Sequence, residues 1–390
     1  MDQDFVLKIT KQYFYTAGFY LMPFKPSNRS GYLKMVLKKI QFVFGIGSIL
    51  TAASLCALYI YFNLSDMKNI FEGLSNINLL TITAFKALII WWKHEPILEV
   101  LRKLKLENDE KRSKKYLKGS LKFFHPYQKF SFILFATTLI GFVLASIVRN
   151  FSLGPDEKSL IYKIYLPFDY QPMVIYIITQ IWSEFVGFSC AFLQVACDGL
   201  FFGILIMLSS EFNELSDVLI NLDYKKDHLQ LRNCAIKHQE LLQINKEIEA
   251  IFSLSTFLTF VDSSLTICFA TLECFIGQEE WLKYVTFVLY AAIILNHIFF
   301  YCFFCQQLHD ANSNIGEQII MGNWYESNDK RVLTSVHLIL MKSQQIVKLT
   351  ALNFTVITIN SFSNTMRTEV QQVRIIDNLL LLQESSKWVL

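Results

Sequence analysis

Seven apolar segments, each long enough to cross a lipid bilayer, constrain this chain more than any other feature. A helix needs roughly 20 mostly apolar residues to span the hydrocarbon core. The segments of this kind cover residues 42–62, 74–92, 130–149, 173–208, 252–277, 282–304 and 347–368. Because backbone polar groups in lipid must be satisfied within the segment, such segments form helices. We predict an all-α integral membrane protein built as a seven-transmembrane helical bundle.

The composition agrees with a lipid bilayer as the main surrounding of the chain. Hydrophobic residues make up 53% of the sequence and charged residues 18%, whereas a soluble domain carries about 25% charged residues. No run of basic residues alternates with aromatic residues as a nucleic-acid groove would require. We therefore expect no nucleic acid among the partners.

The distribution of Lys and Arg predicts the orientation of the bundle. Basic residues gather in segment 1–38 and again between the second and third spans, in segment 93–129. Short basic segments stay in the cytoplasm. The N-terminus is therefore expected inside and, after seven spans, the C-terminus outside, opposite to G-protein-coupled receptors.

The apolar periodicity extends the helices beyond the membrane. Within 209–251 and 331–346, apolar residues recur at intervals of three and four residues, as in amphipathic helices. The seventh span is the most polar, which suits the wall of a pore or the centre of a packed bundle. We divide the chain into a cytoplasmic segment 1–38, helices one to six with cytoplasmic extensions at 39–304, a cytoplasmic loop and anchor helix at 305–346, a seventh helix at 347–368, and a tail at 369–390.

The sequence offers no constellation for catalysis or for a metal. The seven histidines are scattered, and no glycine-rich phosphate loop is present. Cys302 and Cys305 have zinc-like spacing, but no second Cys or His pair accompanies them, so packing inside a helix explains them better. We expect no enzymatic activity, no cofactor and no metal site.

Ionisable residues inside the spans are better clues to function. Lys86, Glu184, Asp198, Asp262 and Glu273 would each cost a few kcal/mol if they faced lipid. Lys86 and Asp198 lie at similar depth in the inner half of two inward-running spans, so we predict that they form a structural pair. A transporter could use such groups as a proton relay, although seven unpaired spans do not fit paired transporter halves.

Aromatic residues with a few hydroxyl and amide groups mark the outer halves of spans three to six. Such a mixture suits a pocket for a small apolar ligand, although aromatic residues also serve ordinary packing and the membrane interface. The predicted ligand-binding residues are Phe142, Ser146, Tyr176, Gln180, Phe269 and Tyr290.

Five stretches in the right order resemble the insect odorant receptor family. Each stretch is a loose motif, but together they span nearly the whole chain. They are YTAGFYLMPF with Gly18 and Pro23, Lys86 followed by KHEPILEVLRKL, CDGLFFGILIMLSSEFNELSDVL led by Asp198, residues 231–268 with Cys234 and His238, and residues 323–366 with Trp324, Tyr325, Ser343 and Gln344.

The resemblance implies an odorant-gated, non-selective cation channel subunit. Such subunits form heterotetramers with an odorant co-receptor subunit in the plasma membrane of sensory neuron dendrites, and they bind small hydrophobic volatile ligands. Four seventh spans would line one pore, here through Phe354, Ile357, Ser361 and Thr365. A gustatory-type receptor of the same superfamily is the alternative, followed by a proton-coupled transporter.

The chain departs from the family pattern in two places. The family has proline shortly after the Ser343-Gln344 pair, whereas residues 345–347 here are Gln, Ile and Val. The resemblance also stops at Thr368, where the family continues with a short Ser-Tyr-Ser-x-Phe-like stretch. Glu369, Arg374 and Asp377 would then lie at the pore mouth, so the tail is predicted to impair ligand control while assembly stays intact.

Overall fold

The chain folds into long helices that pack side by side. The computed structural model describes residues 29–107 except 66, residues 162–276 and 281–344, residue 160, and, with gaps, parts of 119–144 and 349–371. The elements are α2 (Arg29–Phe62), α3 (Met67–Trp92), α4 (His94–Glu107), α6 (Met173–Ile220), α7 (His228–Ile276), α8 (Trp281–Met321), the 3-10 helix η1 (Trp324–Glu326), α9 (Lys330–Ser343), β1 (Thr350–Ala351) and β2 (Thr355–Val356). The described residues within 119–144 are also helical. The all-α prediction is confirmed.

Five of the predicted spans coincide with membrane-capable helices. Among the described residues, α2, α3, α6, α7 and α8 are long and apolar enough to cross a membrane. They contain the spans expected at 42–62, 74–92, 173–208, 252–277 and 282–304, the fifth as far as Ile276. The span expected at 130–149 lies only partly within the described residues.

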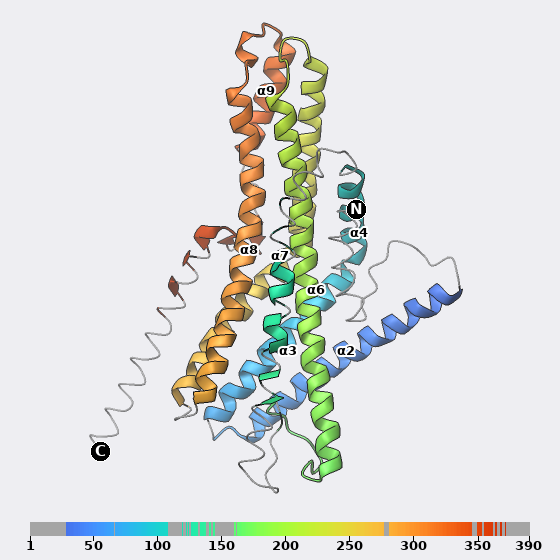
Figure 1. Cartoon of the computed structure of the whole chain (residues 1–390), viewed down its shortest axis with the longest axis vertical. Coiled ribbons are helices and arrows are strands. Elements are labelled where there is room, and N and C mark those ends of the chain that lie inside the picture. Colours follow the sequence, from blue (N-terminus) through green and yellow to red (C-terminus); the bar gives the residue numbers. More distant parts are fainter. Residues whose placement is uncertain are drawn as a thin grey trace, which may run out of the picture.

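Three helices continue past the predicted spans and form a base at one end of the molecule. Figure 1 shows α6, α7 and α8 as columns that reach the same end, where α9 packs against α7 and α8. The extension of α6 and α7 through 209–251 was predicted and is confirmed. The loop expected from residue 305 is wrong, because α8 continues to Met321. Its apolar periodicity persists, with Leu308, Ala311, Ile315 and Ile319 all buried.

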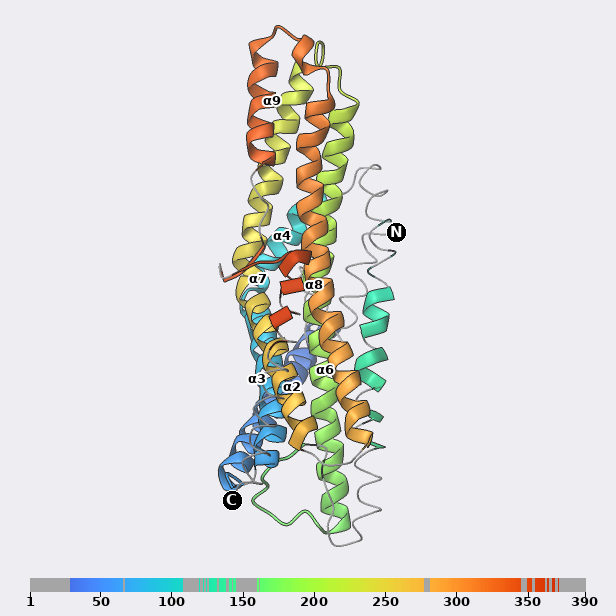
Figure 2. The same cartoon turned by 90° about the vertical axis from the view of Figure 1, so that its left-hand side faces the viewer.

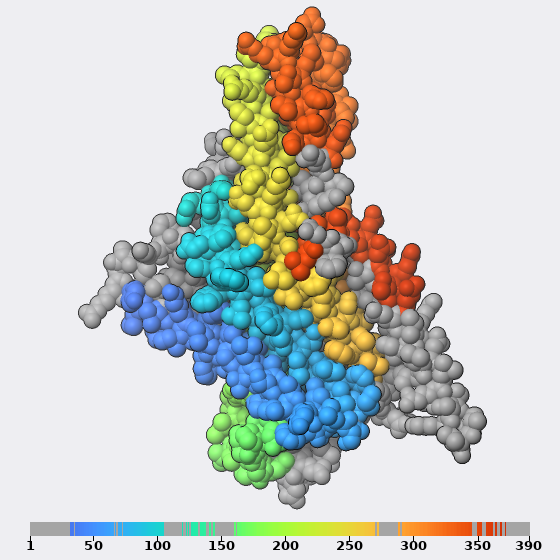
Figure 3. Space-filling model, turned by 180° about the vertical axis from the view of Figure 1, so that it is seen from behind, coloured from blue at the N-terminus to red at the C-terminus, as the bar shows by residue number. Residues whose placement is uncertain are grey.

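The first two described helices cover one side of the bundle. In Figure 3, α2, α3 and then α7 lie as neighbouring bands across the surface, and the contacts between α2 and α3 and between α3 and α7 agree with this order. Helix α2 begins at Arg29, ten residues before the expected boundary at residue 39. The predicted N-terminal segment 1–38 is therefore helical over its last residues.

Helix α6 is the central column of the fold. It packs against α2, α3, α4, α7 and α8, and it is buried on nearly every face along its middle. A helix that is apolar all round is expected to lie inside a bundle. Its Phe201 and Phe202 pack against Tyr301 of α8, with ring centroids 5.3 and 4.9 Å apart.

The segment expected as a continuous helix at 347–368 begins differently. β1 and β2 form an antiparallel hairpin in which Ala351 pairs with Thr355, and Leu352 in the turn has φ 49°. The run Thr355-Val356-Ile357-Thr358 is β-branched, which favours extended backbone over helix. Described helical residues resume at 359. The prediction of a helix from residue 347 is therefore wrong for the described residues 349–352 and 355–358.

Candidate functional site

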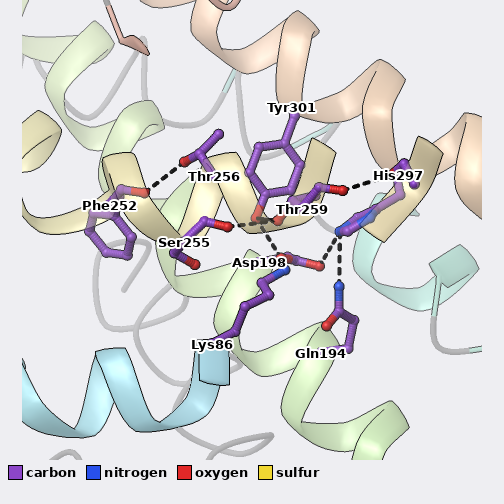
Figure 4. A network of polar contacts seen from close by, with 10 residues as sticks. Lys86, Gln194, Asp198, Phe252, Ser255, Thr256, Thr259, His297 and Tyr301 are labelled. Atoms are coloured by element: carbon purple, nitrogen blue, oxygen red, sulfur yellow. Dashed lines mark hydrogen bonds and ion pairs between the residues drawn. The ribbon is translucent and has the colours of Figure 1, made fainter. Parts of the chain in front are cut away.

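A group of buried polar side chains lies where α3, α6 and α8 meet, and Asp198 is at its centre. Lys86 Nζ of α3 lies 2.8 Å from Asp198 Oδ1. From α8, Tyr301 donates its hydroxyl to Oδ1 at 2.6 Å, and His297 Nε2 lies 2.6 Å from Oδ2. Figure 4 shows these side chains converging on the carboxylate, together with Gln194. We call these five residues the Asp198 cluster.

Every charge in the Asp198 cluster has a partner. The side chains of Lys86 and Asp198 are only 1% and 3% exposed, and an isolated buried ion costs several kcal/mol. Three donors surround the carboxylate, and the Lys86 ammonium also lies 5.7 Å from the centre of the Tyr301 ring. The structure thus brings together the two residues predicted as a pair.

The other three members of the cluster, Gln194, His297 and Tyr301, were not predicted. His297 and Tyr301 are four residues apart on α8, and Gln194 and Asp198 are four residues apart on α6. That spacing places each pair on one face of its helix. Gln194 Nε2 lies 3.3 Å from His297 Nε2, so the two faces meet. Polar residues repeated at this spacing inside apolar spans were the available signal.

A second polar contact joins α3 to α7 nearby. Asn78 donates through Nδ2 to Asp262 Oδ1 at 2.9 Å and to Thr266 Oγ1 at 3.1 Å. Helix α3 is therefore tied to α6 and α8 by Lys86 and to α7 by Asn78. Because each contact requires one particular register between two helices, the two contacts together fix how the bundle packs.

This geometry suits a structural role for the Asp198 cluster. Its carboxylate accepts from donors on α3 and α8 and so joins three helices. Cys302 and Cys305 are both buried in α8. Among the described residues, no group of His, Cys, Asp and Glu is arranged to hold a metal ion.

The predicted ligand-binding residues lie at the other end of the bundle from the base, as far as they are described. Tyr176 and Gln180 are half-buried near the start of α6, and Phe269 is half-buried on α7. Gln180 Nε2 lies 3.5 Å from Glu184 Oε1 on its own helix, and Tyr176 packs against the core. The side chains of Phe142, Ser146 and Tyr290 lie outside the described residues.

The predicted pore-lining residues are only partly described. Ile357 is 2% exposed and belongs to the chain's own core, because the hairpin turns it inward and its amide donates to Leu349 O. Its assignment to the pore wall therefore does not fit the structure. Ser361 is half-buried and donates to Val356 O. Phe354 and Thr365 lie outside the described residues.

Comparison with known proteins identifies the family. The family model described as 7tm Odorant receptor matches residues 66–370. The match includes the whole Asp198 cluster and residues 349–368, which we call the last segment. The chain belongs to the odorant receptor family. Odorant receptor 85b of Drosophila melanogaster is 23% identical over 326 residues, covering 80% of this chain and 83% of that protein. Odorant receptor 85c of the same species is 22% identical over 268 residues, covering 65% and 69%.

A solved structure has the same fold. The insect olfactory receptor OR5 from Machilis hrabei in complex with eugenol matches with a TM-score of 0.79 at 14% sequence identity, covering 97% of this chain and 100% of that one. A second structure of the same receptor matches with a TM-score of 0.77 at 13% identity, covering 95% and 97%. The family match ends at residue 370, close to Thr368, where the sequence departs from the family pattern. This odorant receptor is a multi-pass membrane protein, and its family is one of receptors rather than enzymes.

Proposed function

We propose that this odorant receptor is a subunit of an odorant-gated, non-selective cation channel. It works with an odorant co-receptor subunit in a heterotetramer in the plasma membrane of olfactory sensory neurons. The pore is shared, and each subunit contributes its last segment. The ligand is a small hydrophobic volatile molecule bound between the outer halves of the helices.

One observation carries the channel proposal: the last segment exposes polar side chains beside the spanning helices. Asn360, Ser363, Asn364 and Thr368 are all exposed. Figures 1 and 2 place the described part of this segment near the mid-height of α8. These residues belong to the seventh predicted span, and polar groups within a span are costly against lipid and are found facing protein or water. A water-filled pore shared between subunits supplies that surrounding.

The half-buried residues at the outer end of α6 support a ligand site there. Gln180 Oε1 is buried and has no hydrogen-bond partner among the described residues, so it can accept from a ligand hydroxyl, while Tyr176 and Phe269 offer apolar surface. Eugenol, bound by the OR5 relative, is a small ligand of this general kind. The proposed site also includes Phe142, Ser146 and Tyr290. A site with few polar groups binds small ligands weakly, because ligand size limits affinity.

Voltage clamp tests the proposal. Cells that express the chain with an odorant co-receptor are exposed to a broad panel of volatile ligands, and cells with either subunit alone serve as controls. We expect ligand to increase the inward cation current, and only when both subunits are present. Saturable, pH-driven substrate uptake without ligand-gated current would instead indicate a transporter and contradict the proposal.

A further inference from the structure

A buried amide in the base connects three helices. Asn312 of α8 is 0% exposed and His238 of α7 is 1% exposed. His238 Nε2 lies 2.9 Å from Asn312 Oδ1, and Asn312 donates through Nδ2 to the backbone oxygen of Ser343 at 3.3 Å. Because an amide oxygen only accepts, His238 is the donor in the first bond. We call His238, Asn312 and Ser343 the base link.

The base link holds the end of α9. Ser343 is the last residue of α9, and its carbonyl is one of those that a helix leaves without an intrahelical partner. Asn312 therefore caps α9 from a neighbouring helix. Gly316 lies close by: a Cβ there would lie 2.5 Å from Ser343 Oγ. Helices α8 and α9 thus approach closely at this point.

The chain enters its last segment a few residues after the base link. Thr350 in β1 donates through Oγ1 to Glu249 Oε1 of α7 at 2.7 Å, and Ile357 N donates to Leu349 O at 3.0 Å. The chain is therefore attached to the bundle on both sides of residues 345–348. Before them, Ser343 of α9 is bonded to Asn312 of α8. After them, Thr350 of the last segment is bonded to Glu249 of α7.

We propose that the base link positions the last segment and transmits movement of α7 and α8 to it, so that it sets how readily ligand opens the channel. This inference rests on the proposed channel function. Helices α7 and α8 run from the outer end, where Phe269 lies, to the base. Rigid helices with fixed hydrogen-bonded ends carry coupling between distant sites, and the same coupling works in both directions.

The decisive variant is Asn312→Asp. The aspartate has the same shape and keeps the oxygen that accepts from His238, but it replaces the donor to Ser343 with an oxygen that repels the carbonyl. With the co-receptor present, we expect the ligand concentration for half-maximal current to rise roughly tenfold, within the range typical of coupling between sites. Surface protein and assembly with the co-receptor should be retained, because the new carboxylate keeps His238 as its hydrogen-bond donor.

A matched control lies two residues along the same helix. Asn314 is half-buried and accepts through Oδ1 from Gln318 Nε2 at 2.9 Å. Asn314→Asp makes the same chemical change without touching α9, so its response should equal that of the unmodified chain.

A second pair of variants tests the hydrogen bond between His238 and Asn312. His238→Gln retains a donor and should preserve the response, whereas His238→Leu should shift it as Asn312→Asp does.

The outcomes distinguish a failure of the base-link proposal from a failure of the channel proposal. Absence of ligand-evoked current from the unmodified chain with its co-receptor would refute the proposed function and this inference with it. A normal current from the unmodified chain, with unchanged responses from Asn312→Asp and His238→Leu, would refute the link alone. Loss of Asn312→Asp, His238→Gln and His238→Leu from the cell surface would also overturn it, because the link would then serve folding only.

Discussion

At the scale of single residues, the Asp198 cluster is asymmetric. Lys86 has Asp198 as its ionic partner among the described residues, whereas Asp198 has Lys86, His297 and Tyr301. Removing the carboxylate leaves a buried ammonium without its partner. Removing the ammonium leaves a carboxylate with two donors. The two deletions should therefore differ in cost.

We expect Asp198→Ala to be the most damaging change in this cluster, lowering stability by about 3–5 kcal/mol because it leaves an unpaired buried charge. Lys86→Met should cost less, and the double variant Lys86→Met/Asp198→Ala should cost less than Asp198→Ala alone. Thermal unfolding of the purified receptor and the amount at the cell surface measure this order. A double variant no better than Asp198→Ala would show that the charge pair does not dominate.

Lys86 and Asp198 could be predicted from the sequence as members of this cluster, whereas their neighbours on α8 could not. A lysine and an aspartate in apolar spans each demand a partner, so pairing them was a strong inference. His297 and Tyr301 make no such demand, although their four-residue spacing marks one polar face of α8. To add these two residues to the site, one must know which face of α6 meets which face of α8. This depends on how the helices pack and not on the local sequence pattern.

At the scale of elements, α9 is a short amphipathic helix that depends on the base. Its buried residues Val332, Val336 and Ile339 face the bundle. We expect Val336→Asp to detach α9, because a carboxylate there would be buried without a partner. Surface delivery and assembly with the co-receptor should both fall strongly.

The control for α9 is Thr334→Asp, which places the same charge at an exposed position of the same helix. It should leave surface delivery close to that of the unmodified chain. Surface amount is measured by labelling intact cells, and assembly by co-purification with the co-receptor. Equal loss from Val336→Asp and Thr334→Asp would contradict a burial effect.

Helical elements were largely predictable, whereas the start of the last segment was not. The apolar periodicity of 209–251 and 331–346 predicted helices, and α6, α7 and α9 cover most of these segments. In 347–368, length and mean polarity suggested a helix. There, a short β-branched run and one residue with positive φ produced a hairpin instead. A short apolar run does not by itself distinguish helix from strand.

At the scale of the whole molecule, the tail at 369–390 should determine how tightly the channel closes. Glu369, Arg374 and Asp377 replace the apolar ending that the family resemblance implies. Charges at a narrow pore mouth either hydrate it or pair and distort the helix end. Replacing 369–390 with a Ser-Tyr-Ser-x-Phe-like ending should reduce ligand-independent current and increase the ligand-evoked fraction in voltage clamp. Equal, tightly gated currents from both versions would show that the tail is harmless.

The orientation of the whole bundle follows from one contact between a basic segment and the base. Lys103 of α4 lies in the basic segment 93–129, and its Nζ is 2.9 Å from both carboxylate oxygens of Glu247 on α7. This hydrogen bond raises the pKa of Lys103. The contact places the basic segment on the side of the α7 extension, so the positive-inside rule predicts a cytoplasmic base.

Two matched epitope insertions test this orientation. One tag follows Lys226 in the turn between α6 and α7, and the other follows Ser65 in the turn after α2; both residues are exposed. Figure 1 places these turns at opposite ends of the bundle. We expect intact cells to label the tag at Ser65, and the tag at Lys226 to be labelled only after permeabilisation. Labelling of the Lys226 tag on intact cells would reverse the topology. The extended base could then not be the cytoplasmic platform to which α9 and the last segment are attached.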